Sequence, residues 1–163
     1  ADVYRYDVVT GYQAGLFPPG AWNSLEAFRN PPFYALLYTP TAGLPYPVSA
    51  WLWNAVSLAA LVVGVRWLGP ARPWAAAGWA LTFLPVFAVV SYGQNSLLSL
   101  AVIAGTYRLL ANGRVFCAGL AAGLLWFKPP LLLGLLAWWA LDLRAKWPAV
   151  LGLVASGAAL TLG

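Results

Sequence analysis

The sequence predicts an all-α fold, a polytopic membrane helix bundle with about six transmembrane helices and one interfacial helix. Of its 163 residues, 62% are hydrophobic and only 8% are charged, whereas an ordinary soluble domain carries ~25% charged residues. Long stretches contain no Asp, Glu, Lys or Arg, namely residues 30–65, 73–107, 115–127, 129–141 and 147–163. About six spans of ~20 residues each use most of the chain. We therefore expect a single transmembrane domain over residues 1–163 and no separate soluble domain.

The N-terminal part of the chain is its polar part. Residues 1–31 predict a long outer loop with a short helix near residues 2–12. Pro31 and Pro32 then open an aromatic segment that further prolines interrupt before it reaches ~20 residues. We expect residues 32–46 to form an interfacial helix, because amphipathic aromatic rings are favoured in the headgroup region.

The transmembrane helices are expected over residues 48–163, separated by charged or polar turns. The first covers residues 48–65, and the second covers residues 74–90 with a kink at Pro85. The polar residues 91–96 predict a hairpin. Further helices are expected at 97–107, 115–127, 131–141 and from 147 onward, with turns at 112–114, 128–130 and 142–146.

The distribution of basic residues predicts the orientation, because Lys and Arg are enriched on cytoplasmic loops. Six fall on the loops placed inside: Arg66, Arg72, Arg108, Arg114, Arg144 and Lys146. Only three fall outside: Arg5, Arg29 and Lys128. This threading requires the segments on either side of Lys128 to be separate short helices. The first loop, the turn at residues 93–95 and Lys128 then share the outer face and can converge on one site.

The residue types exclude several kinds of chemistry. Without any His, the chain has no imidazole acid or base, no Ser-His-Asp triad and no histidine metal site. Cys117 lies in an apolar run, and we interpret it as a small buried hydrophobic residue. The sequence contains no metal-ligand cluster, so no cofactor is expected, and a divalent cation is compatible but not indicated. Nucleic acid is not an expected partner, because the basic residues are scattered among apolar spans.

Two carboxylates of the first loop are candidate catalytic groups. Asp2 and Asp7 could each act as a general base, and Arg5 between them could bind a phosphate. Tyr4 and Tyr6 would add stacking surfaces for a sugar. The alternative is a solvated loop of mixed charges.

Lys128, Gln94 and Asn95 are candidate binding residues on the outer face. Lys128 stands between two 13-residue apolar runs, each ~20 Å long as a helix and shorter than the ~30 Å hydrocarbon core. Its ammonium could pair with a lipid phosphate, or it could simply reach the headgroups. Gln94 and Asn95 could bind a polar substrate, or Asn95 could cap a helix.

Tryptophans are abundant in the predicted spans. They suggest either an aromatic groove for a sugar or polyprenyl chain, or an interfacial belt. The residues concerned are Trp51, Trp53, Trp126, Trp138 and Trp139.

Several short motifs, taken in order, resemble glycosyltransferase family 87, the polyprenyl-phosphate-mannose-dependent alpha-mannosyltransferases of the GT-C class. They are Asp2-x-Tyr4, Gly15-Leu16-Phe17-Pro18, Phe28-x-Asn30-Pro31-Pro32, Gly93-Gln94-Asn95 and Gly119…Lys128-Pro129. The resemblance covers essentially the whole chain. It implies a GT-C-like bundle in which the first outer loop carries the essential acid, a position that Asp2 matches.

The resemblance implies an enzyme that transfers a hexose, mannose by analogy, from a polyprenyl-phosphate donor to a hydroxyl of a lipid or glycan acceptor. Transfer would occur at the outer leaflet of a bacterial plasma membrane, with inversion at the anomeric carbon. Asp2 would be the general base and Asp7 the second choice, while Arg5, Gln94, Asn95 and Lys128 would bind substrate. No metal is required by this scheme.

The chain is expected to be a fragment of a longer protein, because it has no Met and ends within an apolar segment. By the resemblance, the missing first span would end just before Asp2. The main rival interpretation is a transporter or flippase-like bundle, since short and proline-broken helices also occur in transporters. A long polar outer loop with two carboxylates favours the enzyme.

Overall fold

The structure is a computed structural model that describes residues 5–16 and 31–162. The regular elements in these ranges are helices, which confirms the all-α prediction for the described chain. The chain divides into two compact units, residues 1–37 and residues 38–163. Each unit is described separately.

The first unit contains helix α1, Tyr6–Leu16, and the short helix α2, Pro32–Ala35. Helix α1 lies further along the chain than the helix expected at residues 2–12. Asp7 lies in its first turn, where a carboxylate is favoured by the helix dipole. Part of the sequence predicted as a loop is therefore helical.

The segment expected to be interfacial consists of two short helical pieces. After α2, a 3₁₀ helix, η2, covers Leu36–Thr41 and crosses into the second unit. Pro40 lies inside η2, and Pro45 precedes the next helix. Because proline lacks a backbone N–H, these residues prevent one continuous helix over 32–46.

Helix α3, Tyr46–Leu68, is the first long helix of the second unit, close to the expected span at 48–65. It ends at Gly69, whose φ of 73° is a left-handed conformation that suits glycine. Among the described residues, α3 is the helix long and apolar enough to cross a membrane, and a bent helix pair gives a second candidate if counted as one span. The expected number of six transmembrane helices is not confirmed.

That bent pair is α4, Pro73–Leu81, and α5, Leu84–Tyr92, which meet at an angle of 71°. The expected kink at Pro85 is therefore misplaced, since the break lies at residues 82–83. Pro85 sits in the first turn of α5, where its missing N–H leaves no helical hydrogen bond unmade. Thr82 closes α4 instead, as its Oγ1 donates to the carbonyl of Trp79 at 2.8 Å.

The remaining elements follow the expected order. They are α6 at Ser96–Ala111, α7 at Val115–Gly123, the 3₁₀ helix η3 at Leu124–Phe127, α8 at Pro129–Ala140 and α9 at Leu143–Leu162. The prediction of a loop at residues 142–146 is wrong, because Arg144 and Lys146 already belong to α9. Both residue types are good helix formers, so their charge did not mark a loop.

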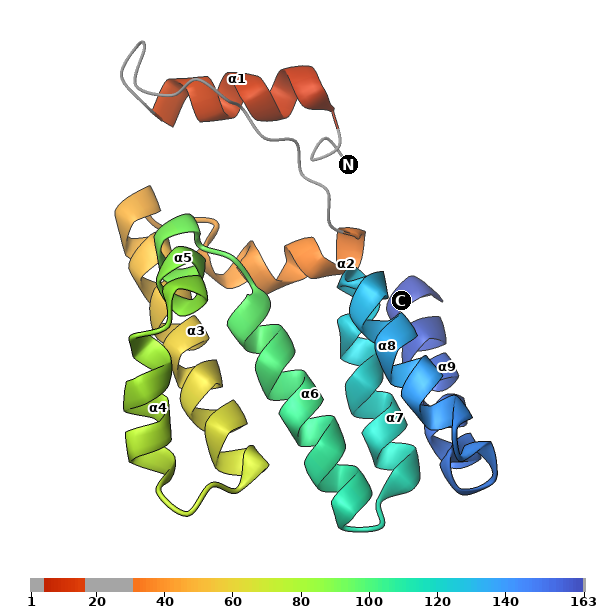
Figure 1. Cartoon of the computed structure of the whole chain (residues 1–163). Coiled ribbons are helices and arrows are strands. Elements are labelled where there is room, and N and C mark those ends of the chain that lie inside the picture. Colours follow the sequence, from red (N-terminus) through yellow and green to blue (C-terminus); the bar gives the residue numbers. More distant parts are fainter. Residues whose placement is uncertain (1–4, 17–30, 163) are drawn as a thin grey trace. The chain divides into compact units, whose positions relative to one another are not determined.

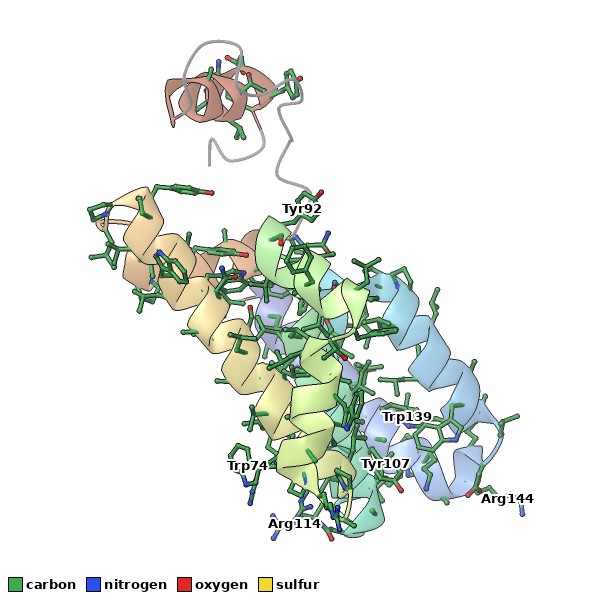
Figure 2. The ribbon with its side chains drawn as sticks, turned by 60° about the vertical axis from the view of Figure 1, so that its left-hand side comes forward. Trp74, Tyr92, Tyr107, Arg114, Trp139 and Arg144 are labelled. Atoms are coloured by element: carbon green, nitrogen blue, oxygen red, sulfur yellow. The ribbon has the colours of Figure 1, made fainter. Side chains whose placement is uncertain are left out.

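Successive helices of the second unit alternate in direction, counting the bent pair α4–α5 as one (Figure 1). The chain also reverses at Lys128, as the threading requires. Six basic residues lie near the helix ends on one side, which we call the basic end: Arg66, Arg72, Arg108, Arg114, Arg144 and Lys146. Figure 2 shows Arg114 and Arg144 at this end and Tyr92 at the other. The opposite end holds residues 93–96 and Lys128, and we call it the polar end.

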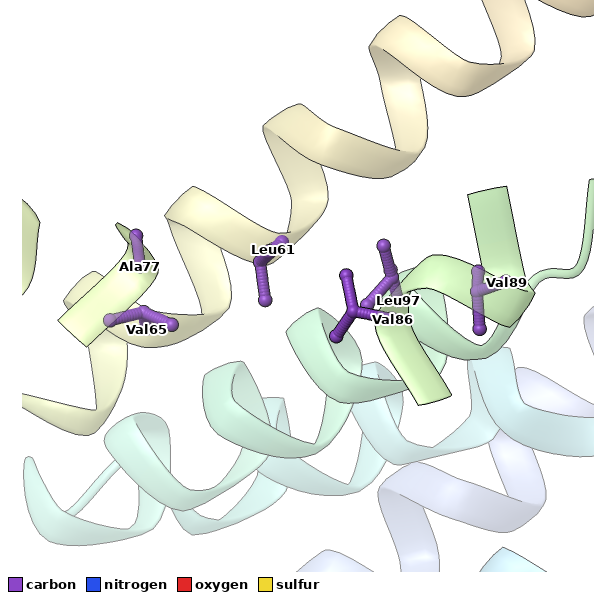
Figure 3. Packing of buried hydrophobic residues seen from close by; sticks show 6 residues of the cluster. All are labelled: Leu61, Val65, Ala77, Val86, Val89 and Leu97. Atoms are coloured by element: carbon purple, nitrogen blue, oxygen red, sulfur yellow. The ribbon is translucent and has the colours of Figure 1, made fainter. Parts of the chain in front are cut away.

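Two apolar clusters hold the second unit together. The first lies between α3, α4, α5 and α6 (Figure 3) and contains Leu61, Val65, Ala77, Val86, Val89 and Leu97. The second joins α7, η3, α8 and α9 through Ala122, Leu125, Leu132, Trp139, Ala149 and Leu153. Helix α6 packs on both α3 and α7, so it links the two halves of the unit. Cys117 is exposed, and its interpretation as a buried residue is therefore wrong.

Helices α7 and α9 pack with their backbones close together. A Cβ atom added to Gly119 would collide with the carbonyl of Ala149, and one added to Gly152 with the carbonyl of Phe116. Such small residues let apolar helices approach and gain van der Waals contact.

We expect Gly119→Ala to lower the free energy of unfolding by about 1–3 kcal/mol, the usual cost of overpacking. Gly134→Ala is the matched control, because nothing lies within 4 Å of the added Cβ. Thermal unfolding of the purified variants in detergent measures the difference. Equal unfolding temperatures for the two variants would contradict the close packing of α7 and α9.

We expect cysteine labelling to place the two ends of the bundle on opposite sides of the membrane. In a Cys117→Ala background, single cysteines at positions 20 and 94 should react from outside, and those at 70 and 112 only from inside. The reason is the excess of basic residues at the basic end. Labelling of 94 and 112 from the same side would overturn the orientation.

Candidate functional site

The turn at residues 93–95 is held in place by α3. Gly93 ends α5 with a φ of 61°, and the Gln94 N–H donates to the carbonyl of Val89 at 2.9 Å. Trp53 Nε1 donates to the carbonyl of Gly93 at 2.8 Å. The ring of Tyr38 lies against that of Trp53, with centroids 4.6 Å apart. Two aromatic side chains thus fix the turn that begins α6.

Lys128 lies at the break between η3 and α8, outside both helices. Pro129 and Pro130 cause the break, since a residue before proline avoids the helical region and proline is accepted at a helix start. The half-buried Lys128 Nζ donates to Ser96 Oγ at 3.1 Å. Burial lowers the pKa of the Lys128 ammonium below its ordinary value.

The structure therefore brings together two of the three segments expected to form the site. Lys128 reaches the start of α6, directly after Gln94 and Asn95. No carboxylate pairs with Lys128 in the described parts of the chain. Its charge is available to an anion at the polar end.

Gln94 and Asn95 keep their side-chain amides free of hydrogen bonds within the described residues. Gln94 is exposed and Asn95 is half-buried. Asn95 occupies the N-cap position of α6, but its side chain makes no capping bond. Its carbonyl instead accepts from Ser99 Oγ at 3.2 Å. Both amides can donate to and accept from a polar ligand.

The third expected segment belongs to the first unit. Arg5 and Asp7 form an exposed ion pair, with Arg5 Nη2 2.7 Å from Asp7 Oδ2. Arg5 Nε also donates to Asp7 Oδ1 at 3.4 Å. Asp2, the favoured general base, lies outside the described residues. In the ranges 5–16 and 31–162, no group of three or more His, Cys, Asp or Glu residues could hold a metal ion.

The family model for glycosyltransferase family 87 matches residues 28–163. The chain belongs to glycosyltransferase family 87. Searches of curated proteins and of solved structures give no match.

Membership identifies the chain as a glycosyltransferase, and such an enzyme needs a sugar donor and an acceptor. Family 87 enzymes are typically membrane proteins, in agreement with the span candidate α3. The matched region includes the turn at 93–95 and Lys128, whereas Asp2, Arg5 and Asp7 precede it.

Sequence reasoning missed two polar features of this family 87 chain. Ser96 is the hydroxyl partner of Lys128. The sequence places Ser96 in a polar turn but does not indicate this contact. Asn54 and Ser57 carry side-chain oxygens that are buried and find no hydrogen-bond partner among the described residues. Their spacing of three puts them on one face of α3. A polar pair inside an apolar helix is the signal that could have revealed them.

The tryptophans divide between several roles. Trp51, Trp126 and Trp138 are exposed, as expected for an apolar bundle in lipid, whereas Trp139 is buried in the second cluster. Trp53 holds the turn at residue 93. The described structure therefore does not gather the five tryptophans into one aromatic groove.

Proposed function

We propose that this family 87 glycosyltransferase transfers a hexose, specifically mannose, from a polyprenyl-phosphate donor to a hydroxyl of a lipid or glycan acceptor. The reaction takes place at the outer leaflet of a bacterial plasma membrane, within a multi-pass bundle of the GT-C kind, and inverts the anomeric carbon. The alternative of a transporter is disfavoured by membership in a glycosyltransferase family.

The observation that carries the proposal is the contact between Lys128 Nζ and Ser96 Oγ at the polar end. A cation that has no carboxylate partner among residues 5–16 and 31–162, next to a hydroxyl and two free amides, suits a phosphate joined to a sugar. Charge-assisted hydrogen bonds to phosphate are among the stronger polar contacts in proteins. Six basic residues at the opposite end agree with a polar end that faces outward.

The chemistry requires one base and one cation. The acceptor oxygen attacks the anomeric carbon while the bond from that carbon to the phosphate oxygen breaks. Polyprenyl phosphate leaves with the bonding electron pair, and Lys128 stabilises the negative charge that develops on it. The Asp2 carboxylate takes the proton from the acceptor hydroxyl. Gln94, Asn95 and Arg5 bind the sugar and phosphate.

The test is an assay of the full-length protein reconstituted in vesicles. Polyprenyl-phosphate mannose with a radiolabelled sugar should transfer label to an acceptor fraction, while nucleotide-linked mannose should not. The anomeric configuration of the product should be opposite to that of the donor. Movement of donor or sugar across the membrane without any sugar transfer would favour the transporter and overturn the proposal.

A further inference from the structure

A hollow in the second unit lies between α3, α6 and α7, with a volume of about 610 Å³. This volume falls within the ~300–1,000 Å³ typical of small-molecule sites. Most of its lining is apolar, including Val56, Val63 and Leu98. Arg108 and Arg114 line it at the basic end. The hollow therefore combines an apolar trough with two cations at one extremity.

Neither guanidinium has a polar partner in the described part of the chain. Within residues 5–16 and 31–162, Arg108 and Arg114 form no ion pair and no side-chain hydrogen bond. Asp142, the acid of the second unit, is exposed and likewise has no ion pair there. The two arginines present an uncompensated positive charge beside an apolar surface.

The wall of the hollow near the arginines is shaped by one aromatic contact. Trp67 lies over Gly105, since a Cβ atom added to Gly105 would approach the Trp67 ring to 2.8 Å. Both residues line the hollow. Tryptophan is the residue type enriched at the boundary between headgroups and acyl chains.

The length of the hollow matches one leaflet. Its lining on α3 extends from Val56 to Trp67, about 16 Å at ~1.5 Å per residue. Half of a ~30 Å hydrocarbon core is ~15 Å. A chain that enters at the arginines would reach the middle of the bilayer.

We propose that this hollow binds an anionic glycerophospholipid from the leaflet at the basic end. One acyl chain lies along the apolar trough, and Arg108 and Arg114 hold the phosphate, for which guanidinium groups are well suited. The site is separate from the donor site at the polar end. It depends on the multi-pass membrane placement proposed above, but not on the transferase reaction.

The test is native mass spectrometry of the full-length protein, purified in detergent and titrated with phosphatidylglycerol or phosphatidylcholine. The unaltered protein should retain phosphatidylglycerol in preference to phosphatidylcholine. Each basic residue near a membrane surface contributes ~1 kcal/mol of attraction, so Arg108→Gln with Arg114→Gln should weaken phosphatidylglycerol binding about 30-fold. Ala59→Phe, which fills the trough from an exposed position on α3 and keeps both charges, should also abolish the preference.

Arg144→Gln is the matched control, because it removes an exposed charge at the same end that does not line the hollow. It should leave phosphatidylglycerol binding unchanged. An equal loss in Arg144→Gln would mean attraction by overall charge only. Unchanged phosphatidylglycerol binding in Ala59→Phe would also overturn the proposal. So would the absence of any lipid preference in the unaltered protein, the result expected if a further segment or a second copy fills the hollow. Sugar transfer from the donor is measured on the same variants. Transfer that persists while the lipid preference is absent means that the lipid site is wrong and the proposed transferase function is not.

Discussion

Asp2→Asn is expected to lower the turnover of the full-length enzyme about 10²- to 10⁴-fold, the usual contribution of general-base assistance. Asn is nearly the same size as Asp but cannot take the acceptor proton. Insertion and folding should be unaffected. Steady-state transfer of label from polyprenyl-phosphate mannose, at equal amounts of membrane-inserted protein, measures the effect.

The proposal of Asp2 as the base rests on elimination and on the motif resemblance of the N-terminal segment, which precedes the matched residues 28–163. The chain has no His, and its four carboxylates are Asp2, Asp7, Glu26 and Asp142. Asp142 is expected on the inner face, and Glu26 is expected far along the predicted first loop. Asp7 is already bound to Arg5 at 2.7 Å, which competes with a role as base. Asp7→Asn should therefore have the milder effect, and Asp142→Asn should have none. Near-normal turnover in Asp2→Asn would remove Asp2 as the base, and near-normal turnover in both Asp2→Asn and Asp7→Asn would remove the mechanism.

Lys128→Ala is expected to lower kcat/KM for the donor about 10- to 100-fold, because a hydrogen bond to a charged group is worth ~1.5–3 kcal/mol. Lys128→Arg should keep part of the activity, since a cation remains, although its shape differs. The measurement is transfer at varied concentrations of polyprenyl-phosphate mannose. Acceptor KM should change little.

Lys146→Ala is the control for Lys128→Ala, because it removes the same charge from the basic end. Ser96→Ala should give a smaller loss, since Ser96 accepts the hydrogen bond that orients the Lys128 ammonium. If the donor kinetics stay unchanged in Lys128→Ala, Lys128 does not bind the donor phosphate. Its ammonium then only contacts lipid headgroups.

Local signals predicted the parts of the fold that depend on a few adjacent residues. The turn at 93–95 follows from Gly93, which adopts a left-handed conformation, and the reversal at Lys128 follows from the two prolines after it. The break between α4 and α5 was misplaced because Pro85 fits inside the first turn of a helix. The charges at Arg144 and Lys146 suggested a loop, yet both residues lie in α9.

Contacts between distant segments could not be predicted in the same way. Trp53 and Gly93 are 40 residues apart, and nothing in either neighbourhood specifies the other. The close approach of α7 to α9 depends on which helix faces carry Gly119 and Gly152. Both helices carry apolar residues on all sides, so the sequence pattern does not show which faces meet. The candidate site was therefore predictable as a set of segments, whereas the pairing of Lys128 with Ser96 required the fold.

The most direct test of the central claim is photocrosslinking with a polyprenyl-phosphate mannose analogue that carries a diazirine beside the phosphate. Full-length protein in vesicles would be irradiated, digested and mapped by mass spectrometry. The proposed donor site predicts adducts on residues 93–96 and on Lys128, removed by excess unlabelled donor and reduced in Lys128→Ala. Adducts confined to the basic end, around Arg108 and Arg114, would contradict it.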